Sequence, residues 1–370
     1  MFLAAACAVV LAAGHAEGDD SLKIYLLAGQ SNMVGHGYSH YEGGNHYNIP
    51  SLEFLVNTPA YLAKLPASTY TFKGSLSPDW MGQRTDAWGV HYKSSNRALQ
   101  QVEPTPTTQS GAWSTSIMPL SPGFGGNNAL STFGPELAMG IRLARNLASP
   151  VFLFKSATGG TTLAEDWRPP GAVAARGGTV GVHYANTIDL FRSFLDGLDD
   201  DLARDGRLVR YNNAPGYEVA AFVWFQGWNE KFNNGEGEYA QNIVDLVHDV
   251  RASDPRIPDD LGAIVPESSD QHEGLNAKRI SAVATLNAEH PGSAVFFENN
   301  DMIGNNWGYG FSGSWGYHFN AKAENYLEIG WRTAGAAIEY GFTGSELIPE
   351  PATLALLALG GLGIAGRRRR

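Results

Sequence analysis

Four short segments of the chain contain the residue types that acyl transfer requires. Ser31, in the run Gly-Gln-Ser-Asn-Met at residues 29–33, offers a hydroxyl nucleophile. The Gly159-Gly160 pair and Gln226 offer hydrogen-bond donors, and His318 offers a base. Attack on an ester carbonyl needs an activated serine, a histidine to take its proton and donors to stabilise the oxyanion. The four segments together predict a serine esterase with Ser31 as the nucleophile.

Three of these segments directly follow apolar runs that are typical of buried parallel strands. The runs are residues 23–28, 151–154 and 219–225. Functional groups in open parallel sheets gather at the carboxyl ends of the strands. Each segment also has a plainer interpretation: the serine as a helix N-cap, the glycine pair as a tight turn, and the histidine as a structural or exposed residue. Their joint placement favours a common site.

The elements that must position these segments alternate along the chain. Besides the three runs above, strands are predicted at residues 262–265 and 294–297. Helical periodicity is present at residues 135–147, 184–202, 239–250, 275–288 and 321–338. Alternating strands and helices predict an α/β fold with a parallel sheet covered on both faces. We expect one domain over residues 22–345, with a loop-rich insertion at 37–132 that forms a lid or binding surface or hides short strands.

In their order along the chain, the four segments resemble the sialate O-acetylesterase-like branch of the SGNH hydrolases, near carbohydrate esterase family 6. Gly134-Pro135-Glu136 also matches in order. The resemblance implies a flavodoxin-like three-layer sandwich and removal of O-acetyl groups from carbohydrate, such as sialate or acetylated xylan. It also implies that Ser31 is the nucleophile and His318 the base. The oxyanion donors would be the N–H groups of Ser31 and Gly160 and the side chain of Gln226.

One position departs from the pattern of this family. The family places an aspartate three residues before the histidine, and this chain has Trp315 there. The replacement acid would then be Asp301, Glu230 or Glu324. Orientation of His318 by a backbone carbonyl and a loss of activity are also compatible with the sequence.

Two further functions fit the sequence less directly. A non-catalytic carbohydrate-binding surface protein on the same fold would explain the missing aspartate, with Trp80, Trp88 and Trp113 as sugar-stacking residues. The second is a broader SGNH lipase or thioesterase. We expect no metal and no cofactor, because His36 and His40 lie in a glycine-rich stretch without a partnered carboxylate and no phosphate-binding glycine motif is present.

The two ends of the chain predict export. Residues 1–16 have the apolar stretch and small residues of a signal peptide, and they contain the sole cysteine, Cys7. Residues 349–370 run from Pro-Glu-Pro through a short apolar stretch to four arginines, which resembles the C-terminal signal read by exosortase-type enzymes of Gram-negative bacteria. A simple C-terminal anchor would have a similar composition. We expect a periplasmic, cell-surface or extracellular protein that meets the membrane only transiently, through this tail.

The overall charge excludes one class of partner. The net charge is −11, which argues against nucleic acid as a ligand because such proteins must neutralise phosphates. The expected partners are an O-acetylated carbohydrate substrate and an exosortase-type processing enzyme.

Overall fold

The computed structural model describes residues 20–40, 50–92, 117–124, 132–232, 235–268, 273–303 and 316–344. The predicted signal peptide, Trp113, Trp315 and the predicted tail lie outside these residues. Within them, a seven-stranded sheet has the spatial order β4-β3-β6-β1-β7-β8-β9, and a two-stranded sheet pairs β2 with β5. Only β4 is antiparallel to its neighbour in the large sheet. The strands are β1 (Leu22–Gly29), β2 (Gly37–Tyr38), β3 (Ala87–Tyr92), β4 (Met118–Pro119), β5 (Thr132–Phe133), β6 (Val151–Ala157), β7 (Tyr217–Phe225), β8 (Gly262–Pro266) and β9 (Ala294–Phe297).

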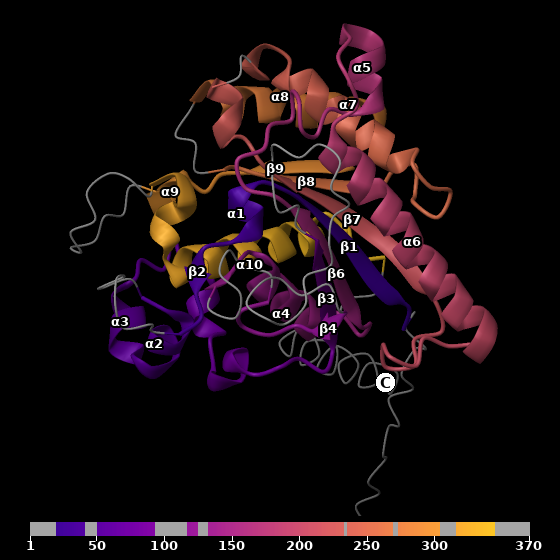
Figure 1. The fold of residues 1–370 in the computed structure, drawn as a ribbon. Helices are drawn as coiled ribbons and strands as arrows, with labels where there is room; N and C mark the ends of the chain where they lie inside the picture. The colour runs from indigo at the N-terminus through magenta and orange to yellow at the C-terminus, as the bar shows by residue number, and fades with distance from the viewer. Residues whose placement is uncertain are drawn as a thin grey trace, which may run out of the picture.

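Helices cover both faces of the large sheet (Figure 1). Helices α4 and α10 pack together on one face, and α6 runs across the other, where α7 and α8 also pack. The α-helices are α1 (Ser31–Val34), α2 (Leu52–Asn57), α3 (Pro59–Lys64), α4 (Glu136–Asn146), α5 (Pro170–Arg176), α6 (Val182–Asp205), α7 (Tyr239–Arg251), α8 (Glu273–Glu289), α9 (Asn300–Ile303) and α10 (Ala323–Glu339). The short 3₁₀ turns are η1 (Phe72–Gly74), η2 (Pro78–Met81), η3 (Trp228–Phe232), η4 (Gly235–Gly237) and η5 (Gly316–Ala321). The five predicted strands and five predicted helices are all present, and the α/β sandwich is confirmed.

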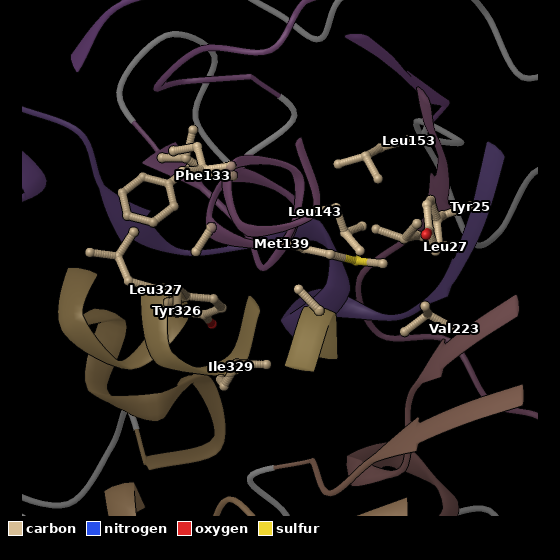
Figure 2. Packing of buried hydrophobic residues seen from close by; sticks show 14 of the residues in the cluster. Tyr25, Leu27, Phe133, Met139, Leu143, Leu153, Val223, Tyr326, Leu327 and Ile329 are labelled. Atoms are coloured by element: carbon tan, nitrogen blue, oxygen red, sulfur yellow. The ribbon is translucent and has the colours of Figure 1, made fainter. Parts of the chain in front are cut away.

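The central strands are apolar throughout because both of their faces are covered. Every residue of β1 is buried, and successive side chains point to opposite sides. Tyr25 and Leu27 join the core beneath α4 and α10, whereas Ile24 and Leu26 join the core beneath α6 and α7. Figure 2 shows the first of these cores, where strand residues such as Leu153 meet side chains from the two helices. Burial on both faces fixes the register of β1 relative to its neighbouring strands. This register determines the position of Ser31, which follows the carboxyl end of β1.

The strand order places a topological switch point at β1. After β1 the chain forms β3 and β4 at one edge of the sheet, returns inward to β6 beside β1, and then crosses β1 to form β7, β8 and β9 on the other side. Crevices outside the carboxyl ends of strands at such a switch point are the usual ligand sites of open α/β sheets. The predicted site residues Ser31, Gly160 and Gln226 follow the carboxyl ends of β1, β6 and β7.

Residues 37–132 contain more regular structure than the insertion predicted from the sequence. They supply β3, which pairs in parallel with β6 inside the large sheet, together with α2 and α3. The pattern missed β3 because its sequence, Ala-Trp-Gly-Val-His-Tyr, is short and mixes small, polar and aromatic residues. The described part of this segment therefore belongs to the core architecture.

In the described part of the chain, no helix has the length and apolar character needed to span a membrane.

Candidate active site

Backbone hydrogen bonds join the carboxyl ends of the three central strands. The N–H of Thr158, after β6, donates to the carbonyl of Gly29 at 3.2 Å, and the N–H of Gln30 donates to the carbonyl of Phe225 at 3.3 Å. Gly29 has no space for a side chain, because a Cβ there would collide with the Phe225 carbonyl. The three loops that follow these strands therefore begin next to one another.

Ser31 occupies the first position of helix α1. The N-cap of this helix is Gln30, which makes no side-chain cap, so the interpretation of Ser31 as an N-cap is wrong. The Ser31 side chain is partly exposed, although its neighbours Gln30 and Asn32 are buried. Its N–H lies in the first helical turn, where amides have no acceptor within the helix. Ser31 thus presents both a hydroxyl and a backbone donor at the switch point.

The glycine pair lies beside this serine. A Cβ built on Gly159 would stand 3.7 Å from the Cβ of Ser31, so the two residues are in near contact. Gly160 has φ +76°, a left-handed conformation that suits glycine, and a Cβ there would stand 3.7 Å from Asn229 Nδ2. The loop after β6 therefore brings its backbone to both the serine turn and the turn after β7.

Gln226 is buried and its carboxamide is held by protein groups. Its Nε2 donates to Glu230 Oε1 at 2.8 Å and to the Thr161 carbonyl at 3.2 Å. These two bonds use both amide hydrogens. Gln226 can therefore donate to an oxyanion only if one of the two internal hydrogen bonds is broken. The role of Gln226 as an oxyanion donor stays a prediction.

Glu230 connects the two loops that flank the serine. Its Oε1 accepts hydrogen bonds from the Gln226 amide and from the N–H of Leu163. Burial raises the pKa of Glu230 to about 7, and the hydrogen bonds from Leu163 and Gln226 oppose that rise. At neutral pH this carboxyl is therefore divided between its charged and neutral forms.

His318 lies in η5, a turn with unusual backbone geometry. The three residues after it, Phe319, Asn320 and Ala321, all have φ between 49° and 58°. A left-handed conformation costs a non-glycine residue about 1 kcal/mol or more, so surrounding contacts must hold this turn. Phe319 is fully buried against Phe225. Packing therefore holds the histidine turn against the end of β7.

The hydroxyl of Tyr326, on α10, joins the histidine turn to the serine turn. It lies 3.0 Å from Asn32 Oδ1 and 3.2 Å from the carbonyl oxygen of His318, and it also hydrogen-bonds to the backbone of His36. Asn32 immediately follows Ser31. Sequence reasoning missed Tyr326, since only folding brings α10 to the end of β1.

The ring of His318 stacks on the ring of His36. Their centroids are 3.7 Å apart and their planes differ by 15°. His318 is half-buried, and burial lowers its pKa to about 4. The imidazole is accordingly neutral, and able to accept a proton, across the neutral pH range.

The three candidate acids hold partners of their own. Both oxygens of Asp301, in α9, accept hydrogen bonds from Arg332, at 2.7 and 2.9 Å. Glu324, in the first turn of α10, accepts from the Tyr61 hydroxyl at 2.9 Å, and burial raises its pKa. The pKa of His318 is lowered by burial, which is the opposite of the shift that an adjacent carboxylate produces. The identity of an orienting acid stays a prediction, and the region around Trp315 lies outside the described residues.

A buried ion pair lies beneath helix α1. Lys155 Nζ is 2.6 Å from Glu136 Oε2 and donates to the carbonyl of Val34 at 2.8 Å, with both charged side chains fully buried. Glu136 Oε1 accepts from the N–H of Gly134 at 2.8 Å. The run Gly134-Pro135-Glu136 is thus tied to the end of the serine helix. Figure 1 shows α1 beyond the end of β1.

The tryptophans proposed as sugar-stacking residues are part of the core. Trp80 is fully buried and stacks on Trp331, and Trp88 is 7% exposed within β3. Neither presents a face to solvent, so this expectation is wrong for both. Among the residues that the structure describes, no cluster of three or more His, Cys, Asp or Glu side chains is arranged to hold a metal ion.

Comparisons with known proteins give a family and a sorting motif. The family described as carbohydrate esterase, sialic acid-specific acetylesterase, matches residues 82–290, and a PEP-CTERM protein-sorting motif matches residues 347–370. A search of curated proteins gave no match.

Two solved structures are similar at low identity. One is XAC1771, a novel carbohydrate acetylesterase from Xanthomonas citri, with 13% identity, a TM-score of 0.45 and coverage of 86% of this chain and 56% of that one. The other is NanS, with 11% identity, a TM-score of 0.43 and coverage of 76% of this chain and 78% of that one. This chain therefore spans about half the length of XAC1771.

The family match extends over more than half of the 370 residues, and the sorting motif indicates export to the cell envelope of a Gram-negative bacterium. The chain belongs to the sialic acid-specific acetylesterase family of carbohydrate esterases and has a C-terminal sorting motif.

Proposed function

We propose that this enzyme removes O-acetyl groups from carbohydrate at or outside the cell surface, with Ser31 as the nucleophile and His318 as the base. The observation that supports this most strongly is the joining of the three strand ends. The backbone bonds from Thr158 to Gly29 and from Gln30 to Phe225 gather the serine, glycine and glutamine loops at one switch point.

The proposed reaction has two steps. Ser31 Oγ attacks the acetyl carbonyl carbon as its proton passes to His318, and the N–H groups of Ser31 and Gly160 donate to the oxyanion. The sugar oxygen leaves with the proton from His318, and the acetyl group stays on Ser31. Water then attacks the acetyl-enzyme as His318 takes its proton; the bond between Ser31 Oγ and the acetyl carbon breaks, His318 returns the proton to Ser31 Oγ, and the acetyl group leaves as acetic acid, which ionises to acetate in solution. We propose Gln226 as the third donor, after one of its internal hydrogen bonds is exchanged.

We propose an O-acetylated sialate or acetylated xylan as the natural substrate class, on the strength of the family. A preference for long acyl chains would instead favour a lipase or thioesterase. Release of acetate from O-acetylated sialate and from acetylated xylan, compared with hydrolysis of 4-nitrophenyl acetate and palmitate, separates these possibilities.

The nucleophile is tested by Ser31→Ala. We expect kcat on 4-nitrophenyl acetate to fall by a factor of about 10⁴ or more, because the covalent step is lost. A serine-directed phosphonate should label the wild type once and the variant not at all. The control is Ser193→Ala on α6, whose hydroxyl bonds only to its own helix at Asp189. Equal turnover by Ser31→Ala and wild type would refute the serine mechanism.

A further inference from the structure

The proposed base of this enzyme lies face to face with a second histidine. The 3.7 Å separation and 15° angle between the rings of His36 and His318 place them in van der Waals contact over their planes. A contact of this kind opposes rotation of either ring about its Cβ–Cγ bond, because rotation would drive the ring edge into its neighbour. The stack therefore limits the directions in which the ring nitrogens of His318 can point.

The backbones of both histidines are held at the same place. The Tyr326 hydroxyl lies 3.2 Å from the His318 carbonyl oxygen and hydrogen-bonds to the backbone of His36. The same hydroxyl lies 3.0 Å from the side chain of Asn32, next to the proposed nucleophile. One buried hydroxyl thus joins the serine turn to the backbones of both histidines.

The segment that carries His36 is itself rigidly placed. Gly35 has φ +99°, and a Cβ there would collide with the backbone of Gly134. After His36, Gly37 and Tyr38 pair with β5. His36 is 8% exposed, so its ring is enclosed by protein and is not a mobile surface side chain. Because the segments on both sides of His36 are held in this way, the His36 ring can restrict the orientation of the His318 ring.

Each of the three carboxylates proposed for the orienting role has a partner other than His318. Asp301 pairs with Arg332 through both oxygens, Glu230 accepts through Oε1 from Leu163 and Gln226, and Glu324 accepts through Oε1 from Tyr61. In addition, the position three residues before His318 is a tryptophan.

We propose that His36 is a positioning residue that orients the imidazole of His318 through ring stacking, in the place where related enzymes use an aspartate. This inference rests on the proposed function, because it takes His318 as the base. When His318 accepts the proton of Ser31, its imidazolium faces the π surface of His36, which favours the charged ring. His36 acts through His318 and makes no contact with substrate in this proposal.

Three substitutions of His36 separate stacking from other roles. His36→Phe keeps a flat ring and removes the nitrogens, His36→Leu keeps bulk without a planar π face, and His36→Ala removes both. On 4-nitrophenyl acetate we expect His36→Phe to retain kcat within about threefold. His36→Ala and His36→Leu should lose about 10- to 100-fold in kcat with KM within about twofold, since misplacement of a catalytic group by about 1 Å costs about this much. The control is His248→Ala, an exposed residue on α7 that pairs with Glu289.

A spectroscopic measurement distinguishes failure of this proposal from failure of the proposed function. In full-length Ser31→Ala with ¹³C-labelled histidine, the ring protons of His318, assigned by their loss in His318→Gln, should show the upfield ring-current shift of a stacked pair. The shift should persist with His36→Phe and vanish with His36→Ala. Wild-type kcat in His36→Ala, or equal losses in His36→Phe and His36→Ala, would overturn the proposal whatever the NMR spectra show. If Ser31→Ala is fully active, the proposed function fails, and the spectra still report whether the stack exists.

Discussion

If His318 is the base, as proposed, its half-buried ring sets the pH range in which the enzyme works. Burial lowers the pKa of His318 to about 4, against about 6.5 for an ordinary histidine. A base must be unprotonated to act, so activity should be lost only as the pH falls through about 4. The profile of kcat/KM for a small acetyl ester against pH reports the pKa values of the free enzyme.

At pH 5.5 we expect the enzyme to retain about 90% or more of its plateau value, whereas a histidine of pKa 6.5 would leave about 10%. The acid limb should be unchanged in Glu230→Gln, which removes a second group of altered pKa near the site. An acid limb centred near pH 6.5 in that variant would show that His318 is more exposed than its surroundings imply, or that it is not the base.

Glu230 makes stability depend on pH in the opposite sense from most carboxylates. Its pKa is raised from 4.5 to about 7 by burial, so between these values the folded protein holds a proton that the unfolded chain has released. The free energy of unfolding should therefore fall as pH rises from about 4.5 to 7 and level off above 7. A shift of this size corresponds to about 3 kcal/mol.

This contribution is isolated by comparing Glu230→Gln with wild type. We expect urea denaturation at several pH values to show that the free energy of unfolding of Glu230→Gln rises relative to that of the wild type by about 2–3 kcal/mol between pH 5 and 8. Glu298→Gln, an exposed position, is the control and should show no such trend. A constant difference between Glu230→Gln and wild type would contradict the raised pKa.

At the scale of elements, the serine helix α1 is held from below by a buried charge. Lys155, on β6, donates to Val34 at the end of α1 and pairs with Glu136 at the start of α4. Replacing it by methionine leaves a buried carboxylate without its cation. Because such an unpaired charge is expensive, Lys155→Met should lower the free energy of unfolding by about 3–5 kcal/mol and reduce kcat through displacement of α1.

The double variant Lys155→Met with Glu136→Gln should recover much of this stability, since no uncompensated charge remains. Thermal and urea denaturation of the single and double variants measure the difference. Arg204→Met, which breaks an exposed ion pair with Asp201 on α6, is the matched surface control and should change stability little. If Lys155→Met is as stable as the wild type, the prediction is wrong, and Glu136 then takes up a proton without a cost in the free energy of unfolding.

At the scale of the whole molecule, the last described residues, which precede the sorting motif, lie at the end of the sheet opposite the candidate site. The last described residues pack at the amino ends of strands: Phe342 lies over Gly262 at the start of β8, and Gly344 lies against Glu218 near the start of β7. Gln226 lies eight residues beyond Glu218 along β7, a distance of about 26 Å at about 3.3 Å per residue. A chain held through this end would direct the site away from its attachment.

Removal of the tail should therefore leave catalysis intact. A variant that ends at residue 345 should keep kcat/KM on a soluble acetyl ester within about twofold of the full chain. A variant that ends at residue 339 also loses the contact between Phe342 and Gly262, and it should unfold at a lower temperature because a buried aromatic is lost. Loss of activity on removal of residues 346–370 alone would contradict this prediction, because it would place the tail at the site.

Much of the framework follows from local sequence alone. Apolar runs such as the one in β1 are buried on both faces, and this periodicity identified five strands of the sheet before folding was considered. The placement of Ser31, Gly160 and Gln226 just after strands also followed from sequence order, because parallel strands share a carboxyl edge. Strand β3 escaped detection because its residues are few in number and mixed in polarity.

Only the tertiary structure decided what surrounds the histidine. The stack of His36 on His318 joins residues 282 positions apart (318 minus 36), and the hydroxyl of Tyr326 reaches Asn32 across a similar separation. No periodicity or motif encodes such contacts, since they depend on where helix α10 packs against α4 and β2. Long-range packing also placed Trp80 against Trp331 in one core and Trp88 in the core on the other face of the sheet, and it left Asp301 paired with Arg332. Local sequence determined the positions of the proposed nucleophile and donors along the sheet, and long-range packing determined what surrounds the proposed base.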